Sequence, residues 1–273
     1  MKPIRLAYAY IDNAGDLLNV DLVEKLSGRK VVCSKIYNAD MIAIGGALFG
    51  AQYSEGFKRR TTQKILGATV GAKPLYVWGS GFYHDYNDNP LYRKNLKICA
   101  LRGMKTRERL RLLTGVDYDV PLADAGFLVD LFLEEKVEKK YKIGLIPHYS
   151  QRGDDVMKRM AADPDVFFID IKRTPTEVVK DIAACECIAS SSLHGLIFAD
   201  ALHIPSLHIL GQTELTAGNF KFEDYYSCFG LEDKPWVMDG DYPRAKDIID
   251  SYRIDPDEVE KKKKQLLDVF PKF

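Results

Sequence analysis

The 273-residue sequence has no excess of charge of either sign. Lysine and arginine together number 39, and so do aspartate and glutamate, which makes the formal net charge at pH 7 zero. A chain without a global positive field does not attract nucleic acid or an anionic membrane over its whole surface. We therefore expect no nucleic-acid partner, while a local basic pocket for a small anion is compatible with this balance.

Long apolar runs are also missing from the sequence. No stretch approaches the roughly 18 consecutive apolar residues that mark a membrane-spanning helix. The N-terminus has no apolar region typical of a secretory signal and passes directly into an alternating segment at residues 6–10. These absences predict a cytoplasmic protein.

Cysteines are few, and their number is odd. The five residues are scattered through the chain, at Cys33, Cys99, Cys185, Cys187 and Cys228. This pattern fits free thiols in a reducing compartment. Cys185 and Cys187 are closely spaced, but a zinc site needs about four ligands and no second pair of Cys or His stands at a suitable spacing. We expect no metal site and interpret both residues as core thiols.

What the sequence does contain is a regular alternation of short apolar runs and helical patterns. The expected strands are residues 2–10, 30–33, 41–44, 74–78, 96–101, 143–147, 166–169, 187–190 and 204–209. The expected helices are residues 16–26, 57–66, 106–113, 154–162, 176–184, 193–202 and 256–270, the third of them capped by Thr106. Such alternation indicates mostly parallel sheets covered by helices on both faces.

A charged stretch at residues 134–142 divides the pattern, which then starts again. We therefore predict an α/β protein with two Rossmann-like, doubly wound domains that face a shared cleft. The first would comprise residues 1–138 and the second residues 139–240. A helical segment would follow at residues 241–273, and its basic run at 261–264 is interpreted as a solvated helix face. Ligands of such sheets bind beyond the carboxyl ends of the strands, so candidate site residues should follow strands.

Two segments near the N-terminus meet this condition. Asn13, Gly15 and Asp16 lie between the first strand and the first helix. Gly15 permits a tight turn, and Asn13 or Asp16 can cap the helix, whose free N–H groups favour an anion or a polar ligand. Gly45 and Gly46 end another strand and remove side chains where a ligand or backbone comes close. Helix capping and close strand–helix packing are the alternative interpretations of these segments.

Later strand ends carry further candidates. Arg102 follows an expected strand, where its planar fork matches a carboxylate or phosphate, with a surface salt bridge as the alternative. Ser191, Ser192 and His194 lie where a buried strand passes into an apolar helix. Serine hydroxyls and helix N-terminal N–H groups make an anion cradle, and the helix dipole tends to lower the pKa of His194. His148 closely follows another strand and could face the same cleft.

Five segments occur in an order that is typical of one family. They are Asn13-Ala14-Gly15-Asp16, Gly45-Gly46-Ala47, Arg102-Gly103 with Thr106, residues 119–126, and Ser-Ser-Ser-Leu-His-Gly at residues 190–195, followed by Pro205. Over roughly residues 8–210 they resemble the polysaccharide pyruvyl transferases. Within that family the set is most similar to the branch associated with ketal pyruvate transfer to exopolysaccharides.

The resemblance implies a fold like that of the two-domain glycosyltransferases called GT-B. It implies phosphoenolpyruvate as the donor of a pyruvyl group. The acceptor would be a sugar hydroxyl pair, on a saccharide or a lipid-linked oligosaccharide. The product would be a pyruvate ketal, with phosphate released and no cofactor required. A lipid-linked acceptor would bring the protein into transient contact with a membrane surface.

The resemblance also implies roles for the candidate residues. His194 would carry out the proton transfer, while Arg102 and the Ser191–Ser192 turn would hold the anionic groups of the donor. Asn13 and Asp16, across the cleft, would position the acceptor. The acceptor would thus lie on the side of the first domain and the donor on the side of the second.

Ser192 is a departure from the family pattern, because many members carry an arginine at this position. Anion binding would then pass to Arg102 or to another cation such as Arg152 or Lys172. Two other functions stay open: a glycosyltransferase with a nucleotide-sugar donor, and a non-catalytic relative that binds sugar, which the change at Ser192 favours. Contacts with a sugar would come from aromatic-rich segments, namely residues 83–92, residues 219–226 and Trp236.

Overall fold

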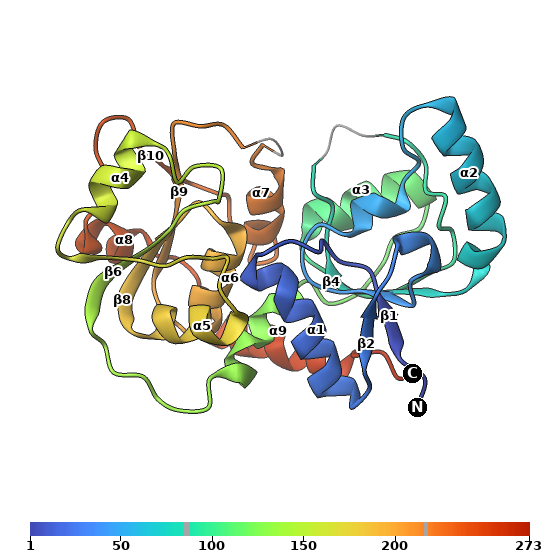
Figure 1. The fold of residues 1–273 in the computed structure, drawn as a ribbon, viewed down its shortest axis with the longest axis horizontal. Helices are drawn as coiled ribbons and strands as arrows, with labels where there is room; N and C mark the ends of the chain where they lie inside the picture. The colour runs from blue at the N-terminus through green and yellow to red at the C-terminus, as the bar shows by residue number, and fades with distance from the viewer. Residues whose placement is uncertain (85–87, 216–217) are drawn as a thin grey trace.

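The computed structural model describes residues 1–84, 88–215 and 218–273, which form two halves that lie side by side (Figure 1). The strands of the first half are β1 (Ile4–Leu6), β2 (Val31–Cys33), β3 (Met41–Ile42), β4 (Leu75–Ser80) and β5 (Leu96–Leu101). Its helices are α1 (Ala14–Ser27), α2 (Phe57–Ala68) and α3 (Met104–Thr114), with shorter 3₁₀ turns at η1 (Ile36–Asn38), η2 (Leu48–Ala51), η3 (Val70–Ala72) and η4 (Ala125–Phe132). The five strands form one sheet in the order β2-β1-β3-β4-β5, with every pairing parallel.

The second half repeats this design. Its strands are β6 (Tyr141–Ile146), β7 (Val166–Phe168), β8 (Cys185–Ser190), β9 (Ser206–Leu210) and β10 (Trp236–Val237). Its helices are α4 (Asp155–Ala161), α5 (Pro175–Ala183), α6 (Leu193–Ala201), α7 (Phe220–Ser227), α8 (Ala245–Ser251) and α9 (Pro256–Asp268). The strands form a second sheet in the order β10-β9-β8-β6-β7, again with every pairing parallel.

Two parallel five-stranded sheets with interleaved helices make this a mixed α/β protein, consistent with the two Rossmann-like domains that the alternating pattern predicted. In sheets of this kind, ligands bind in the crevice beyond the carboxyl ends of the strands. The division of the chain between residues 138 and 139 stays a prediction.

Local sequence signals set several of the helix ends. The side chain of Asn13 accepts a hydrogen bond of 3.0 Å from the backbone N–H of Gly15 and so caps α1. The same helix ends at Gly28, whose φ of 65° is in the left-handed region that suits glycine. Thr174 and Glu177 form a reciprocal capping box at the start of α5. These ends agree with the sequence pattern.

The expected start of α3 was wrong. The helix begins at Met104, after Gly103 as N-cap, and Thr106 is a buried residue within its first turn. The Thr106 hydroxyl donates a hydrogen bond of 2.7 Å to Asp224 on α7 and accepts one of 3.1 Å from the Phe82 N–H. Thr106 therefore joins the two halves rather than capping its own helix.

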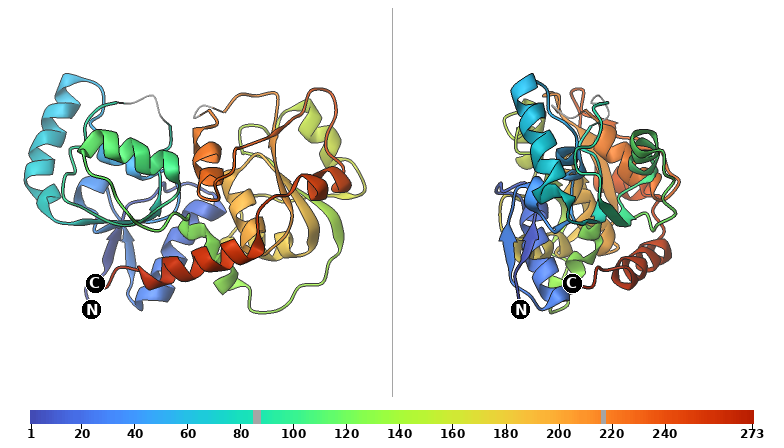
Figure 2. Two further views of the ribbon diagram at one scale, coloured as in Figure 1. Left: turned by 180° about the vertical axis from the view of Figure 1, so that it is seen from behind. Right: turned by 90° about the vertical axis from the view of Figure 1, so that its right-hand side faces the viewer.

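Helix α9 returns from the second half and passes beneath both halves, so that the C-terminus ends beside the N-terminus (Figures 1 and 2). The indole N–H of Trp78 on β4 donates a hydrogen bond of 2.9 Å to the Leu266 carbonyl. This path corrects the expectation that residues 261–264 form a solvated face. Lys262 and Lys263 are buried, because α9 packs that side against both halves, whereas Lys261 and Lys264 stay in solvent.

Two observations concern the described ranges 1–84, 88–215 and 218–273 as a whole. No helix in them is long and apolar enough to cross a membrane. No three or more of their His, Cys, Asp and Glu side chains are grouped so as to hold a metal ion. Cys185 and Cys187 are buried free thiols on β8, as expected for core residues.

Candidate active site

A pocket of about 280 Å³ lies between the two halves, beyond the carboxyl ends of their strands. Its wall consists of residues that follow β1, β3, β4, β5, β6 and β8, together with α7: Ala9, Ile11, Asn13, Asp16, Ile44, Gly45, Gly46, Ala47, Phe49, Tyr83, Arg102, His148, Tyr149, Ser192, Leu193, His194 and Lys221. All but two of the expected site residues line this pocket. The exceptions, Gly15 and Ser191, lie behind its wall.

Gly15 has a steric role, because the His194 ring packs directly against it. A Cβ atom at Gly15 would lie only 2.0 Å from Cγ and Nδ1 of His194. The ring therefore occupies space that only glycine leaves open beneath the first turn of α1. On its other side, Nε2 of His194 lies 3.9 Å from the position that a Cβ atom of Gly45 would take.

His194 is a buried imidazole whose Nε2 atom has no hydrogen-bond partner among the described residues. Burial lowers the pKa of His194 to about 3, with the positive charges of Lys221 and Arg102 as lesser causes. The expected direction of this shift is therefore found, but its main cause is burial. The ring is therefore neutral near pH 7 and has a lone pair that can accept a proton, while the lowered pKa makes it a weaker base than an exposed imidazole.

Asp16 and Lys221 bring opposite charges to the pocket from opposite halves. Burial raises the pKa of Asp16 to about 7, with Asp124 adding to the rise and Lys221 opposing it. Burial lowers the pKa of Lys221 to about 8, with Arg102 adding to the fall and Asp16 opposing it. Within the described part of the chain, neither side chain forms a hydrogen bond or an ion pair. Perturbed groups of this kind gather at functional sites.

Sequence reasoning did not single out Lys221. The residue lies on α7, whose N-cap residue, Asn219, makes no side-chain cap hydrogen bond. Its ammonium nitrogen is 5.9 Å from the ring centroid of Tyr83 and 5.0 Å from that of Phe222. Lys221 is only 8% exposed and forms no ion pair with the described residues, so its charge is available to a bound anion. No local pattern marks it, because several of the groups around it, Tyr83, Arg102 and Asp16, come from the first half of the molecule.

Arg102 has a more restricted position than expected. Its guanidinium is buried and forms an ion pair of 2.8 Å from Nε to Oδ2 of Asp224, while Nη2 donates to the Phe82 carbonyl at 2.5 Å. Both side chains are almost fully buried, at 1% and 0% exposure. Asp224 also accepts hydrogen bonds of 2.7 Å from the N–H and the hydroxyl of Thr106. Arg102 therefore forms part of the pocket wall with its charge already compensated.

The serine cluster mainly holds the turn between β8 and α6. Ser190 donates to the Ile146 carbonyl at 2.9 Å and accepts from the Ser192 N–H at 3.0 Å. Ser191 accepts a hydrogen bond of 2.8 Å from the backbone N–H of His148 and so fixes the loop after β6. Ser192 lines the pocket, and its side chain makes no cap hydrogen bond to α6. Burial lowers the pKa of His148 to about 4, so this second imidazole is neutral as well.

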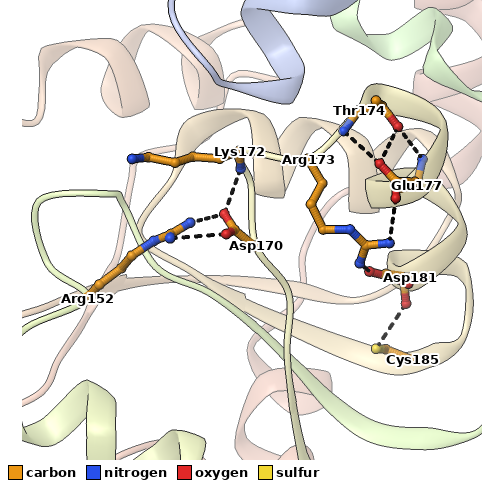
Figure 3. Close-up of polar contacts among 8 residues, drawn as sticks. All are labelled: Arg152, Asp170, Lys172, Arg173, Thr174, Glu177, Asp181 and Cys185. Atoms are coloured by element: carbon orange, nitrogen blue, oxygen red, sulfur yellow. Dashed lines mark hydrogen bonds and ion pairs between the residues drawn. The ribbon is translucent and has the colours of Figure 1, made fainter.

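The alternative cations, Arg152 and Lys172, do not line the pocket. Arg152 is paired with both carboxylate oxygens of Asp170, as Figure 3 shows. The backbone N–H of Lys172 donates to the same carboxylate, and its side chain extends away from it (Figure 3). Neither residue supplies the charge that an arginine in place of Ser192 would bring.

The expected sugar contacts have mixed outcomes. Tyr83 lines the pocket, whereas residues 85–87 of the same segment lie outside the described residues. The segment 219–226 supplies Lys221, and Trp236 does not line the pocket.

Comparison with known proteins gives three matches. A family model described as polysaccharide pyruvyl transferase matches residues 3–212. The uncharacterized protein L143 of Acanthamoeba polyphaga mimivirus is 31% identical over 242 residues, covering 85% of this chain and 76% of that protein. The succinoglycan biosynthesis protein ExoV of Rhizobium meliloti (strain 1021) is 26% identical over 160 residues, covering 58% of this chain and 49% of that protein.

Proposed function

The chain belongs to the polysaccharide pyruvyl transferase family, and we propose that it transfers the pyruvyl group of phosphoenolpyruvate to a hydroxyl pair of a saccharide or lipid-linked oligosaccharide. The product is a pyruvate ketal. The observation that supports this reaction best is the pocket that holds Asp16, Lys221 and His194 together. Among the described residues, Nε2 of His194 has no hydrogen-bond partner. We further propose that the two Rossmann-like halves form a GT-B-like arrangement, with the acceptor on the side of residues 1–138 and the donor on the side of residues 139–240.

The reaction needs three kinds of group. The methylene carbon of phosphoenolpyruvate takes up a proton, which makes the neighbouring carbon oxocarbenium-like. One sugar hydroxyl adds to that carbon, the carbon–phosphate oxygen bond breaks, and the second hydroxyl closes the ketal. Of the two hydroxyl protons, one balances the proton gained by the methylene carbon and the other leaves with phosphate. The site must therefore supply an acid, a base and a cation for the anionic donor.

Asp16 is the acid in this scheme. Because burial raises its pKa to about 7, its carboxyl group is protonated in a large fraction of the molecules near pH 7. His194 is the base that accepts a hydroxyl proton at Nε2, since its ring is neutral and that atom is free. Lys221 binds the carboxylate or phosphate of the donor, with Arg102 behind it in the wall. His194 was expected to carry out the proton transfer. In this scheme it acts only as the base, and Asp16 acts as the acid. Asn13 is left to position the acceptor.

Donor binding can be tested by thermal unfolding in the presence of phosphoenolpyruvate, UDP or GDP. A ligand at one hundred times its dissociation constant adds about 2.7 kcal/mol to stability. We expect phosphoenolpyruvate to stabilise the wild type and to lose this effect in Lys221→Ala. Lys105→Ala is the matched control, because Lys105 is exposed, lies outside the pocket and pairs with Glu223 on the same helix as Lys221.

Thermal unfolding with these ligands, together with an assay of phosphate release, decides between the three functions. Stabilisation by UDP or GDP in place of phosphoenolpyruvate would replace the proposal with a nucleotide-sugar glycosyltransferase. Binding of phosphoenolpyruvate without phosphate release, whatever saccharide is offered, would favour a non-catalytic relative. Once turnover is measured, His194→Ala should abolish it while donor binding persists, and near wild-type turnover in that variant would contradict the role of His194.

A further inference from the structure

Helix α2 lies at the outer edge of the first half (Figure 1). None of its residues is buried. One side of the helix faces the protein. Oε1 of Gln63 accepts a hydrogen bond of 2.8 Å from the Ser54 N–H, and a Cβ atom at Gly67 would lie 2.5 Å from the Tyr92 carbonyl oxygen. These contacts fix the rotation of α2 about its own axis.

The opposite side of α2 is apolar along its centre. Residues spaced by four and three positions lie on one face of a helix. This spacing places Phe57, Thr61, Ile65 and Ala68 on the side away from Gln63 and Gly67. Phe57 is 86% exposed and Ile65 is 60% exposed, although both are large apolar residues. In a globular protein an amphipathic helix normally buries such a stripe, whereas α2 presents it to solvent.

Unpaired positive charge flanks this stripe. Lys58 and Lys64 lie on its two sides, and the helix contains no acidic residue. Arg59 and Arg60 lie toward the side of Gln63, where Arg60 donates a hydrogen bond to Oδ1 of Asn89. None of the four lies within 4.0 Å of a carboxylate in the described part of the chain. The basic residues of α3, by contrast, pair with acidic neighbours. In a chain of zero net charge, α2 is therefore a local excess of positive charge.

We propose that α2 docks the protein on a membrane surface that carries anionic lipid headgroups, with Phe57 and Ile65 entering the headgroup region. An apolar stripe flanked by lysines is the arrangement that a lipid–water interface stabilises, since apolar burial and attraction to anionic headgroups then act together. A soluble polyanion would use the cations but would leave the exposed Phe57 and Ile65 without a role.

The position of α2 also suits this partner. Phe49, on η2, lines the pocket, and residues 52–56 lead from η2 directly into α2. The proposed membrane-binding helix is thus joined to the pocket wall by a segment of five residues. A lipid-linked acceptor could reach the pocket from there, and this last step alone rests on the proposed function.

The test is sedimentation of the full chain with vesicles of phosphatidylcholine, with or without phosphatidylglycerol. We expect wild type to sediment with the anionic vesicles and not with phosphatidylcholine alone. The double variant Lys58→Glu/Lys64→Glu should lower the partition coefficient roughly tenfold or more. The matched control is Lys180→Glu/Lys246→Glu, which changes the net charge equally at exposed lysines of α5 and α8.

The apolar stripe is tested separately. Phe57→Ser/Ile65→Ser should weaken binding to anionic vesicles without changing any charge. Brominated lipid in anionic vesicles should quench the tryptophan fluorescence of Phe57→Trp more than that of wild type. Stabilisation by phosphoenolpyruvate should persist in all these variants, which keeps this result distinct from that of the proposed function. The proposal would be overturned by an equal loss of vesicle binding in the α2 lysine variant and its control. Vesicle binding unchanged by the serine substitutions, or no additional quenching in Phe57→Trp, would overturn it as well.

Discussion

Replacing Asp224 by Asn tests how strongly the buried ion pair with Arg102 holds the two halves together. The substitution keeps the shape of the side chain and removes its charge, so the guanidinium is left with no charged partner in the pair. Asp224 accepts three hydrogen bonds of 2.7 to 2.8 Å, one from Nε of Arg102 and two from Thr106. In Asp224→Asn, an amide NH₂ group would replace one carboxylate oxygen. This NH₂ group would face an N–H or O–H group that now donates to Asp224, so a hydrogen bond would be lost.

The expected cost follows from burial. Breaking a buried pair by neutralising one partner typically costs about 3–5 kcal/mol, because a buried charge is left uncompensated. The neighbouring pair of Glu223 with Lys105 also joins α7 to the first half, but its side chains are 42% and 46% exposed. An exposed pair of this kind contributes about 0.2–1 kcal/mol. Glu223→Gln is therefore a matched control with the same chemistry, on the same helix and one position away.

The assay is urea and thermal unfolding of wild type, Asp224→Asn and Glu223→Gln at pH 7. At about 2–4 °C per kcal/mol for a chain of this size, we expect the Tm of Asp224→Asn to fall by about 6–20 °C and that of Glu223→Gln by less than about 4 °C. Equal and small shifts in the two variants would show that burial does not set the strength of this pair. The reasoning about how the halves are joined would then be wrong.

Three further predictions concern the pocket and α9. Gly15→Ala should lower kcat about a hundredfold, because the new Cβ would displace the His194 ring by more than an ångström; unchanged turnover would contradict the packing argument. The raised pKa of Asp16, about 7, makes its ionisation destabilising, so the contribution of Asp16 to stability falls as the pH rises from about 4 through 7. Asp16→Asn should exceed wild type in free energy of unfolding by roughly 2–4 kcal/mol at pH 8 and by little at pH 4, whereas a pH-independent difference in urea unfolding would rule this out. Lys263→Met should lower the free energy of unfolding by about 2–4 kcal/mol, because Lys263 is buried and donates to the Ala201 carbonyl and to two carboxylates. The control Lys264→Met, at an exposed lysine, should change it by less than about 0.5 kcal/mol. Similar values for the two variants would show that the burial of Lys263 does not contribute to stability.

The elements that sequence predicted well are those with strong local signals. Strand β5 has the expected bounds, residues 96–101. Helix α1 has an asparagine at its start and a glycine just past its end, and α5 has a complete capping box. In such cases the hydrogen bonds that fix the element lie within a few residues of one another. The same reasoning placed most of the site residues, because the carboxyl ends of parallel strands meet at one edge.

The misinterpretations arose where distant contacts determine the role of a side chain. Lys262 and Lys263 belong to a run of four lysines, which in isolation is typical of a solvated face. They are buried because α9 passes beneath both halves, a path that no local pattern reveals. Thr106 resembles a helix cap in the sequence, but its hydroxyl donates a hydrogen bond to Asp224, which is more than one hundred residues away along the chain. Each of these three residues has at least one hydrogen-bond partner in the opposite half of the molecule.

The chemistry of the pocket depends on these same long-range contacts. Burial is the largest cause of the pKa shifts of Asp16, His194 and Lys221. Asp16, which is half-buried, comes from α1 in the first half, whereas the buried His194 and Lys221 come from α6 and α7 in the second. The surroundings of all three therefore depend on the packing of the two halves. Because the pair of Arg102 and Asp224 joins the first half to α7, loosening it would admit water to all three groups. Their pKa values would then return toward ordinary ones, leaving an ionised carboxylate where the proposed reaction needs an acid.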